Sequence, residues 1–313
     1  MKVYLQSQKG SSKYASEDRI LVGSEVFADQ EAVRFLDRGH VLLADGVGGN
    51  NAGAVAAFQV CKKMSEVDEL RPEAFSAINE HLFSMGVENE NYRNMATTAT
   101  GVLFSSTTTA VSYHVGNTRL YAIQAGEYLK QLTSDDTVVE YLIRTGKLTE
   151  EEAKNYPARN EITSCFGGGK ASLLRIKVDN INLAQFHHFL LTCDGIHDYL
   201  TLDEMEDILG QCNGDWSKAI GELITRAKES GSPDDCSAVI IDCDLSSIES
   251  CCDVNDEQKH EPIQQNNPGS TIDCISDEYA QNIKVAPSST ESMSSAKNKL
   301  WNFFKKKPEH REE

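Results

Sequence analysis

The segment from residue 96 to residue 133 restricts the fold more than any other part of the chain. It consists of strand-like runs, which short turns such as GNT and AGE separate: TTATGVLFS, TTTAVSYHVG, RLYAIQ and EYLKQLT. Such runs and turns are typical of antiparallel meanders. Elsewhere the sequence adds more strand-like runs and two pairs of helical patterns, at 52–67 and 72–86 and from about 201 and 215. Hairpin-joined strands with paired helices predict an α+β layered fold rather than a parallel βαβ sheet.

The composition changes after Leu245. Residues 246–282 contain few large apolar side chains and many Ser, Asn, Gln and acidic residues, so they cannot bury a core. We therefore predict a folded domain over 1–244 and an acidic, polar, disordered tail over 245–313. The tail closes with a short basic and aromatic segment, KNKLWNFFKKKPEH, which could dock weakly on an anionic membrane or on an acidic partner.

Charge and cysteine content restrict the class of protein. The formal net charge of −18 argues against a nucleic-acid partner, because an acidic surface repels phosphate backbones. Nine cysteines without a CxxC pair are typical of reduced thiols rather than of a disulfide framework. The start MKVYLQSQKG lacks the apolar core of a signal peptide, and no stretch is long enough to span a membrane. These features predict a cytoplasmic protein.

Four aspartates lie where an apolar strand ends or begins. Asp45 and Asp194 each follow an apolar run and precede a glycine, whereas Asp18 and Asp234 come just before apolar runs. A single Asp-Gly of this kind is usually a turn, and it can also hold a phosphate loop or a metal ion. If the sheets bring the four together, their repulsion requires cations, and oxygen ligands without His or Cys favour Mg²⁺ or Mn²⁺. The bare turn at Gly46 would then leave its carbonyl open as a further ligand.

In chain order, the short blocks of residues 1–244 resemble those of one family. The blocks are SEDR, LLADGVGG, ATTA, VGNTRLY, LTSDDT, TSCFG, LLTCDGIHDYL and GSPDDCSAVII. They are similar to the metal-dependent type 2C protein serine/threonine phosphatases (the PPM family) in their short bacterial form. The resemblance implies a four-layer αββα sandwich, in which helix pairs flank two antiparallel sheets and the metal site lies at one end between them. We expect a monomer.

The resemblance assigns roles to the acidic positions. Asp45 would bridge two Mn²⁺ or Mg²⁺ ions, and the Gly46 carbonyl would bind one of them. Asp194 and Asp234 would bind the other ion. The remaining positions are Asp18 and Glu17, which would reach the second metal, and Asp135, which would help to hold a third, weaker metal. The polar, helical insertion at about 136–160 matches the flap that contacts substrate.

The mechanism that the resemblance implies has no phosphoenzyme. Hydroxide shared by the two metals attacks the phosphorus of phosphoserine or phosphothreonine in line, while cations neutralise the phosphoryl oxygens. No nucleophilic side chain is needed, and the sequence offers neither a Ser-His-Asp nor a Cys-His constellation. The substrates would be phosphorylated proteins, and the enzyme would oppose a serine/threonine kinase.

Several positions depart from the family pattern. Lys13 stands where the family has an arginine that binds phosphate, and it would bind the substrate phosphate in place of that arginine. Asn117 replaces an aspartate, Asp136 a histidine and Ser164 an arginine. These changes keep open a second hypothesis, a catalytically weak or inactive relative that binds phosphoproteins as a regulatory module. A nucleotide-binding loop at DGVGGNNAG is less suitable, because it lacks the P-loop Lys-Ser/Thr and the GxGxxG order. His197 is expected to be a local hydrogen-bonding partner rather than a ligand.

Overall fold

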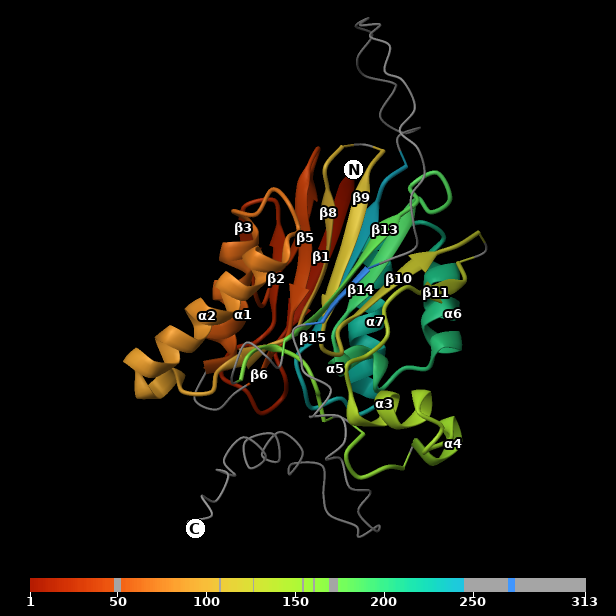
Figure 1. Ribbon diagram of the computed structural model, residues 1–313. Coiled ribbons are helices and arrows are strands. Elements are labelled where there is room, and N and C mark those ends of the chain that lie inside the picture. The colour runs from red at the N-terminus through yellow and green to blue at the C-terminus, as the bar shows by residue number, and fades with distance from the viewer. Residues whose placement is uncertain are drawn as a thin grey trace, which may run out of the picture.

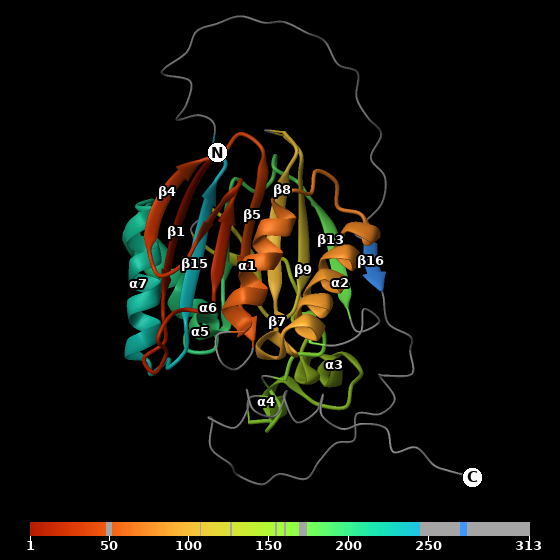
Figure 2. The same cartoon turned by 90° about the vertical axis from the view of Figure 1, so that its left-hand side faces the viewer.

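Two stacked antiparallel sheets form the centre of the protein in a computed structural model (Figure 1). The structure describes residues 1–47, 52–106, 108–125, 127–153, 155–159, 161–168, 174–244 and 270–273. Helices cover the outer face of each sheet, so the layers follow the order helix, sheet, sheet, helix (Figures 1 and 2). The predicted α+β class and the four-layer αββα sandwich are confirmed.

The first large sheet has the strand order β11-β10-β14-β15-β1-β4. Its strands are β1 (Lys2–Gln8), β4 (Glu31–Phe35), β10 (Arg119–Ile123), β11 (Leu129–Gln131), β14 (His188–Thr192) and β15 (Cys236–Asp242). The second has the order β16-β13-β9-β8-β5-β2-β3. Its strands are β2 (Arg19–Val22), β3 (Glu25–Phe27), β5 (Gly39–Ala44), β8 (Ala99–Phe104), β9 (Ala110–Val115), β13 (Arg175–Ile181) and β16 (Ser270–Asp273).

The segment 96–133 is not one meander, as the short turns suggested. Its strands β8 and β9 pair in the second sheet, whereas β10 and β11 pair in the first. The chain changes sheets at the GNT turn, where Gly116 has a φ of 102°. Residues other than glycine rarely adopt such a backbone conformation. This turn therefore joins the two layers of the sandwich instead of closing a hairpin.

Period-two alternation explains why the central strands are apolar throughout. On β5, Val41 and Leu43 point into the core between the sheets, while Leu42 and Ala44 point into the core under the helices. Successive side chains of a strand face opposite sides, so a strand with a core on each side needs apolar residues at every position. The buried run VLLA at residues 41–44 meets that requirement.

Two helix pairs close the outer layers. Helices α1 (Ala52–Met64) and α2 (Pro72–Glu88) cover the second sheet and confirm the first predicted pair. Helices α6 (Leu202–Cys212) and α7 (Trp216–Glu229) cover the first sheet and begin at the capping residues Thr201 and Asp215. The short elements are α5 (Asp194–His197) and the 3₁₀ helix η1 (Glu90–Tyr92).

The predicted helical insertion lies at one end of the sandwich (Figure 1). It contains α3 (Val138–Arg144) and α4 (Glu150–Ala153). Its two ends meet in an isolated bridge between Thr137 and Ile162. A small third sheet, of order β12-β7-β6, lies at the same end and consists of β6 (Gly46–Val47), β7 (Ala96–Thr97) and β12 (Phe166–Gly167).

Part of the expected tail belongs to the second sheet. Residues Ser270–Asp273 form β16, which pairs antiparallel with β13 along Arg175–Val178. This strand was not predicted, because STID lies in a polar segment without apolar alternation. The other residues after 244 lie outside the described residues, so the domain boundary remains a prediction. No helix in the described ranges is long and apolar enough to cross a membrane.

Candidate active site

Strand pairing places Asp194 and Asp234 side by side. β14 and β15 are antiparallel neighbours, with Thr192 opposite Ala238. The residues that follow β14 and those that precede β15 therefore lie at the same end of the first sheet. A Cβ atom built on Gly195 would lie 1.9 Å from the carbonyl oxygen of Asp235, which is direct evidence that the two segments touch.

The second sheet brings Asp18 and Asp45 together in the same way. Arg19, the first residue of β2, lies opposite Ala44, the last residue of β5. Asp18 precedes the one strand and Asp45 follows the other. The four predicted aspartates thus lie in two pairs, one on each sheet, at strand ends that face the same end of the sandwich.

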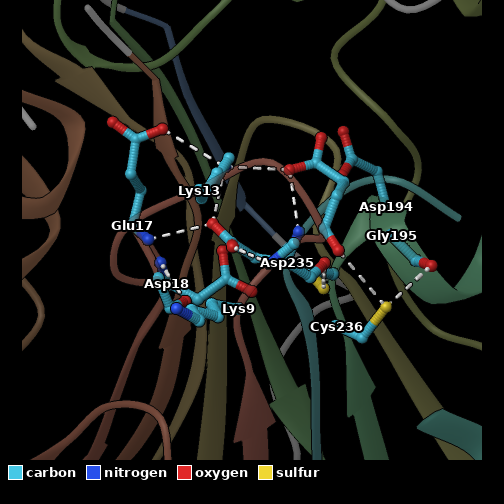
Figure 3. A network of polar contacts seen from close by, with 12 residues as sticks. Lys9, Lys13, Glu17, Asp18, Asp194, Gly195, Asp235 and Cys236 are labelled. Atoms are coloured by element: carbon cyan, nitrogen blue, oxygen red, sulfur yellow. Dashed lines mark hydrogen bonds and ion pairs between the residues drawn. The ribbon is translucent and has the colours of Figure 1, made fainter. Parts of the chain in front are cut away.

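Lys13 lies at the centre of the cluster (Figure 3). Its ammonium nitrogen is 2.6 Å from Oδ2 of Asp235, 2.9 Å from Oδ1 of Asp234 and 3.2 Å from Oε2 of Glu17. Burial alone would lower the pKa of Lys13, but the Asp234 charge and the hydrogen bond to Asp235 outweigh it. The pKa is therefore raised above its ordinary value, with a contribution from Asp45, and the side chain stays an ammonium.

Asp235 was missed from the sequence, where its neighbour Asp234 was chosen. Its Oδ1 accepts a hydrogen bond from the Gly10 N–H (2.7 Å), and its Oδ2 accepts one from the Glu17 N–H (2.9 Å). The side chain is only 2% exposed. The period of two along a strand could have indicated it. Val239 faces the core between the sheets, so Ser237 and Asp235, two and four residues earlier, lie on the same side of the chain.

Asp18 carries the clearest sign of an additional ligand. It is 0% exposed, and among the described residues neither carboxylate oxygen has a partner at full hydrogen-bond geometry, although the Ser237 hydroxyl lies close enough to oppose the rise of its pKa. Burial, and then the charge of Asp235, raise the pKa of Asp18 to about 7. A buried carboxylate without partners is costly unless a cation or a proton neutralises it.

The backbone of Asp45 is fixed by the ATTA motif. Its N–H donates to the Thr98 hydroxyl (3.0 Å), and its carbonyl accepts from the Thr98 N–H (2.9 Å) and from the Thr97 hydroxyl (2.9 Å). All three residues are buried. With its main chain held on both sides, the Asp45 side chain leaves the sheet in one direction.

Close packing explains why a glycine follows Asp45. A Cβ on Gly46 would lie 2.3 Å from the carbonyl oxygen of Gly53 in α1 and 2.7 Å from that of Glu17. No other residue fits this contact without moving the backbone. The glycine lets the start of α1 pack against the residues that carry Glu17 and Asp18. Residues 48–51 of the same motif lie outside the described residues.

Asp194 is the first residue of α5. Its hydrogen-bond partner is Asn117, one of the residues that depart from the family pattern. The amide nitrogen of Asn117 donates to Oδ2 of Asp194 at 3.2 Å. The amide oxygen of Asn117 is buried and has no hydrogen-bond partner in the described part of the chain. Besides the two oxygens of Asp18, a third oxygen without a hydrogen-bond partner among the described residues therefore lies beside the aspartates.

Asp135 is held by an arginine. Arg119 donates from Nε to Oδ1 (3.0 Å) and from Nη2 to Oδ2 (2.7 Å), a bidentate pair.

Near Asp135 lies Asp198, which was not predicted from the sequence as a site residue. The side chain of Asp198 reaches solvent, yet the protein around it, followed by the charge of Asp194, raises its pKa to about 7. Its position four residues after Asp194 on one helical turn was the available signal.

Two of the other departures hold the base of the insertion. Asp136 is buried, accepts from the Gly116 N–H (3.0 Å) and lies 2.8 Å from Nζ of Lys177. Ser164, at the other end, accepts from the Arg175 N–H (2.8 Å). His197 is buried, with Nδ1 2.8 Å from the Thr192 hydroxyl, which confirms the predicted local partner.

The donors at this end suit divalent cations such as Mg²⁺ or Mn²⁺. They are oxygens of carboxylates, amides and carbonyls. In the part of the chain that the structure describes, the buried ones without a hydrogen-bond partner belong to Asp18 and Asn117. Within the described ranges, no group of three or more His, Cys, Asp or Glu side chains is arranged to hold a metal ion as it stands. The cation that lies among Glu17, Asp234 and Asp235 is the Lys13 ammonium.

Comparison with known proteins agrees with this geometry. The serine/threonine phosphatase Stp of Listeria monocytogenes is 27% identical over 222 residues, which are 66% of this chain and 85% of that protein. The protein phosphatase PhpP of Streptococcus pneumoniae is 30% identical over 181 residues, which are 54% of this chain and 72% of that protein.

Solved structures of serine/threonine phosphatases are also similar to this chain. The Mycobacterium tuberculosis serine/threonine phosphatase PstP/Ppp superposes with a TM-score of 0.64 at 26% identity, over 77% of this chain and 99% of that one. The catalytic domain of PstP in complex with two manganese ions superposes with a TM-score of 0.61 at 25% identity, with the same coverage. The sequence profile described as Protein phosphatase 2C matches residues 24–234. The chain therefore belongs to the protein phosphatase 2C family.

Proposed function

We propose that this protein phosphatase hydrolyses phosphoserine and phosphothreonine in proteins and that two divalent cations, Mn²⁺ or Mg²⁺, serve it. The observation that carries the proposal is the buried, unpartnered carboxylate of Asp18 beside Asp234 and Asp235. A divalent cation would stabilise a group of this kind, and a pair of such cations is one arrangement by which enzymes hydrolyse phosphate esters. The two manganese ions of the PstP structure support the same number here.

The residues that would hold the cations are those at the strand ends. We assign Asp45 and the Gly46 carbonyl to one ion, with Asp45 shared, and Asp194 and Asp234 to the other. The further assignments are Asp18 and Glu17 toward the second ion, and Asp135 toward a third and weaker one. When bound, such cations supply an activated water and neutralise the phosphoryl oxygens. For Asp135, binding a metal requires that it give up part of its bidentate pair with Arg119.

The thiol nearest the site is unsuited to nucleophilic attack. Cys193 is 0% exposed, its Sγ lies 3.3 Å from the Asp235 carbonyl, and it accepts the Ser237 N–H at 3.1 Å. A thiol that is enclosed and hydrogen-bonded in this way has no path to a phosphate. This supports hydrolysis by water without a phosphoenzyme.

The insertion at the same end is proposed to contact the phosphoprotein. It carries Arg144, Lys147 and Arg159, and Arg159 is close enough to affect the pKa of Asp198. Basic side chains beside the acidic site would attract a phosphorylated segment. The kinase that the enzyme opposes, the monomeric state, the cytoplasmic location and the boundary at residue 244 also stay proposals. The basic and aromatic end of the tail lies outside the described residues, so its docking remains a prediction.

The test is hydrolysis of a phosphothreonine peptide by the full chain with and without Mn²⁺. We expect turnover that EDTA abolishes, and a loss of roughly a hundredfold or more in Asp45→Asn and Asp234→Asn, because electrostatic stabilisation is usually the largest catalytic contribution. Asp242→Asn is the matched control, since Asp242 is a carboxylate at the far end of the same strand, where it pairs with His188. Full activity in EDTA would exclude the proposed mechanism.

One observation keeps a second function in view. Lys13 fills the space between three carboxylates of the site, and a chain whose site closes on its own lysine could bind phosphoproteins without hydrolysing them. Tight binding of the phosphopeptide without turnover at saturating Mn²⁺ would favour this regulatory module.

A further inference from the structure

We propose that Lys13 is a tethered counter-ion that competes with a divalent cation for Glu17, Asp234 and Asp235, and that cation binding releases its ammonium to the substrate phosphate. The inference rests on the proposed function, because it concerns the same site. It reverses the simplest interpretation of Lys13 as a phosphate ligand that is always available.

The first argument is a count of donors. A lysine ammonium has three N–H donors and no acceptor. In this structure three carboxylate oxygens surround it, at 2.6 Å (Asp235), 2.9 Å (Asp234) and 3.2 Å (Glu17). One N–H is hydrogen-bonded to Asp235, and ion pairs with Asp234 and Glu17 hold the ammonium among the carboxylates. A phosphate that bound Lys13 would have to compete with these three carboxylates for the ammonium.

The second argument is that the backbone around Lys13 is fixed against the aspartates. The Ser11 N–H donates to the Pro233 carbonyl at 3.1 Å, and the Gly10 N–H donates to Asp235 at 2.7 Å. A Cβ on Gly10 would lie 2.4 Å from the Pro233 carbonyl oxygen, so this approach requires glycine. Because the loop is docked here, the ammonium stays within reach of the carboxylates whether or not it is paired with them.

The third argument is that Lys13 leaves the site under-neutralised. Asp18 lies next to Asp235, is 0% exposed and has no hydrogen-bond partner for either oxygen in the described part of the chain. One ammonium thus faces several carboxylates. A divalent cation carries twice the charge and accepts six or more oxygen ligands, so it can displace Lys13 and also engage Asp18. Lys13 then occupies the site until a metal ion binds, and it lowers the affinity of the site for that ion.

Direct measurement of metal binding tests the proposal. Mn²⁺ is titrated into the metal-free full chain by calorimetry, at fixed pH and ionic strength, for the wild type, Lys13→Met and Lys9→Met. We expect Lys13→Met to bind Mn²⁺ about ten- to a hundredfold more tightly, the range for one charge-assisted contact. Lys9→Met is the matched control from the same loop, because its ammonium donates to the Tyr14 carbonyl and makes no contact with the carboxylates. It should leave the affinity unchanged.

A second measurement separates competition from a merely structural role. In EDTA, Lys13→Met should melt at a lower temperature than the wild type, because the carboxylates lose their counter-ion. At saturating Mn²⁺ the difference should vanish. A lysine that only supports the fold would lower both melting temperatures equally.

The outcomes are distinguishable from failure of the proposed function. Unchanged or weaker Mn²⁺ affinity in a folded Lys13→Met overturns the competition, and so does a lack of binding by every variant. If Mn²⁺ binds as expected but the wild type does not turn over a phosphothreonine peptide, the competition stands and the proposed activity fails.

Discussion

Lys177 on β13 lies 2.8 Å from Oδ1 of Asp136, and this ion pair joins the sheet to the first residue of the insertion. The Asp136 side chain is 2% exposed, and its other oxygen accepts the Gly116 N–H at 3.0 Å. The pair occupies a position where the family has a histidine in place of Asp136. In this chain Asp136 thus attaches the base of the insertion to the sheet.

Removing one partner of this pair should cost more than removing both. Lys177→Met leaves the Asp136 charge buried with one N–H donor, and we expect a loss of about 3 kcal/mol in the free energy of unfolding. The measurement is urea denaturation at pH 8, where the raised pKa of Asp136 offers little relief by protonation. The double variant Lys177→Met/Asp136→Asn should lose less than Lys177→Met alone, and therefore less than the sum of the two single variants. Additive losses would mean that the two side chains do not interact.

An exposed pair provides the control for that experiment. Lys63, in the last turn of α1, lies 3.1 Å from Glu66, which follows the helix. Lys63→Met should change the free energy of unfolding by less than about 0.5 kcal/mol, because surface ion pairs contribute little.

The strand-end aspartates could be predicted because sheet pairing obeys simple rules. The pattern places Asp194 after one strand and Asp234 before another, and the two residues must meet once these strands, β14 and β15, are neighbours. The same holds for the alternation of β5, whose apolar run specifies a strand between two cores. The local periodicity of apolar residues therefore sufficed to predict most of the strands and helices that form the layers.

Contacts between distant loops could not be predicted in this way. Lys13 reaches Asp235 because residues 10–11 dock on residues 233–235, and no periodic pattern reports such packing. The pair of Arg119 and Asp135 likewise depends on how two turns meet. β16 was missed because backbone pairing with β13 needs no apolar alternation in the added strand.

Stability should fall below neutral pH because of His114. This ring is buried, with Nε2 donating to the Ser134 carbonyl at 3.0 Å. Burial, and then the charge of Lys177, lower its pKa to about 3, against about 6.5 in an unfolded chain. Between these values the unfolded chain binds the extra proton, so the free energy of unfolding decreases as the pH falls. From pH 7 to pH 5 this residue should account for about 2 kcal/mol.

His114→Gln tests the assignment, because glutamine keeps a donor and an acceptor and does not titrate. Urea denaturation of both proteins at pH 7 and pH 5 gives the comparison. The variant should lose about 2 kcal/mol less than the wild type between the two pH values. Equal losses would assign the acid sensitivity to other groups.

Gly195→Ala should damage the site from within the fold. A Cβ there would lie 1.9 Å from the Asp235 carbonyl oxygen, so α5 or the start of β15 must move, at a cost of about 1–3 kcal/mol or more. Because Asp194 and Asp235 flank that contact, Mn²⁺ affinity should fall with it. Gly210→Ala in α6 is the control: no atom lies within 4 Å of its Cβ, and the helix should gain about 0.5–1 kcal/mol. Wild-type stability and metal binding in Gly195→Ala would disprove the close contact.

The final prediction concerns the tail, whose only described part is β16. A chain ending at residue 244 should turn over a small phosphoester within about twofold of the full chain, because every proposed site residue precedes that point and the polar tail adds no core. It should nevertheless lose amide protection on the outer edge of β13, at Arg175–Val178, where β16 pairs. An uncovered edge strand also invites association between copies, so the shortened chain should form more dimers at high concentration. A chain ending at residue 273 keeps β16 and should match the full chain in hydrogen exchange and in association. If both shortened chains exchange like the full chain, β16 contributes nothing to the sheet in solution; if only the shorter one differs, the strand belongs to the domain, whose boundary then lies beyond residue 244.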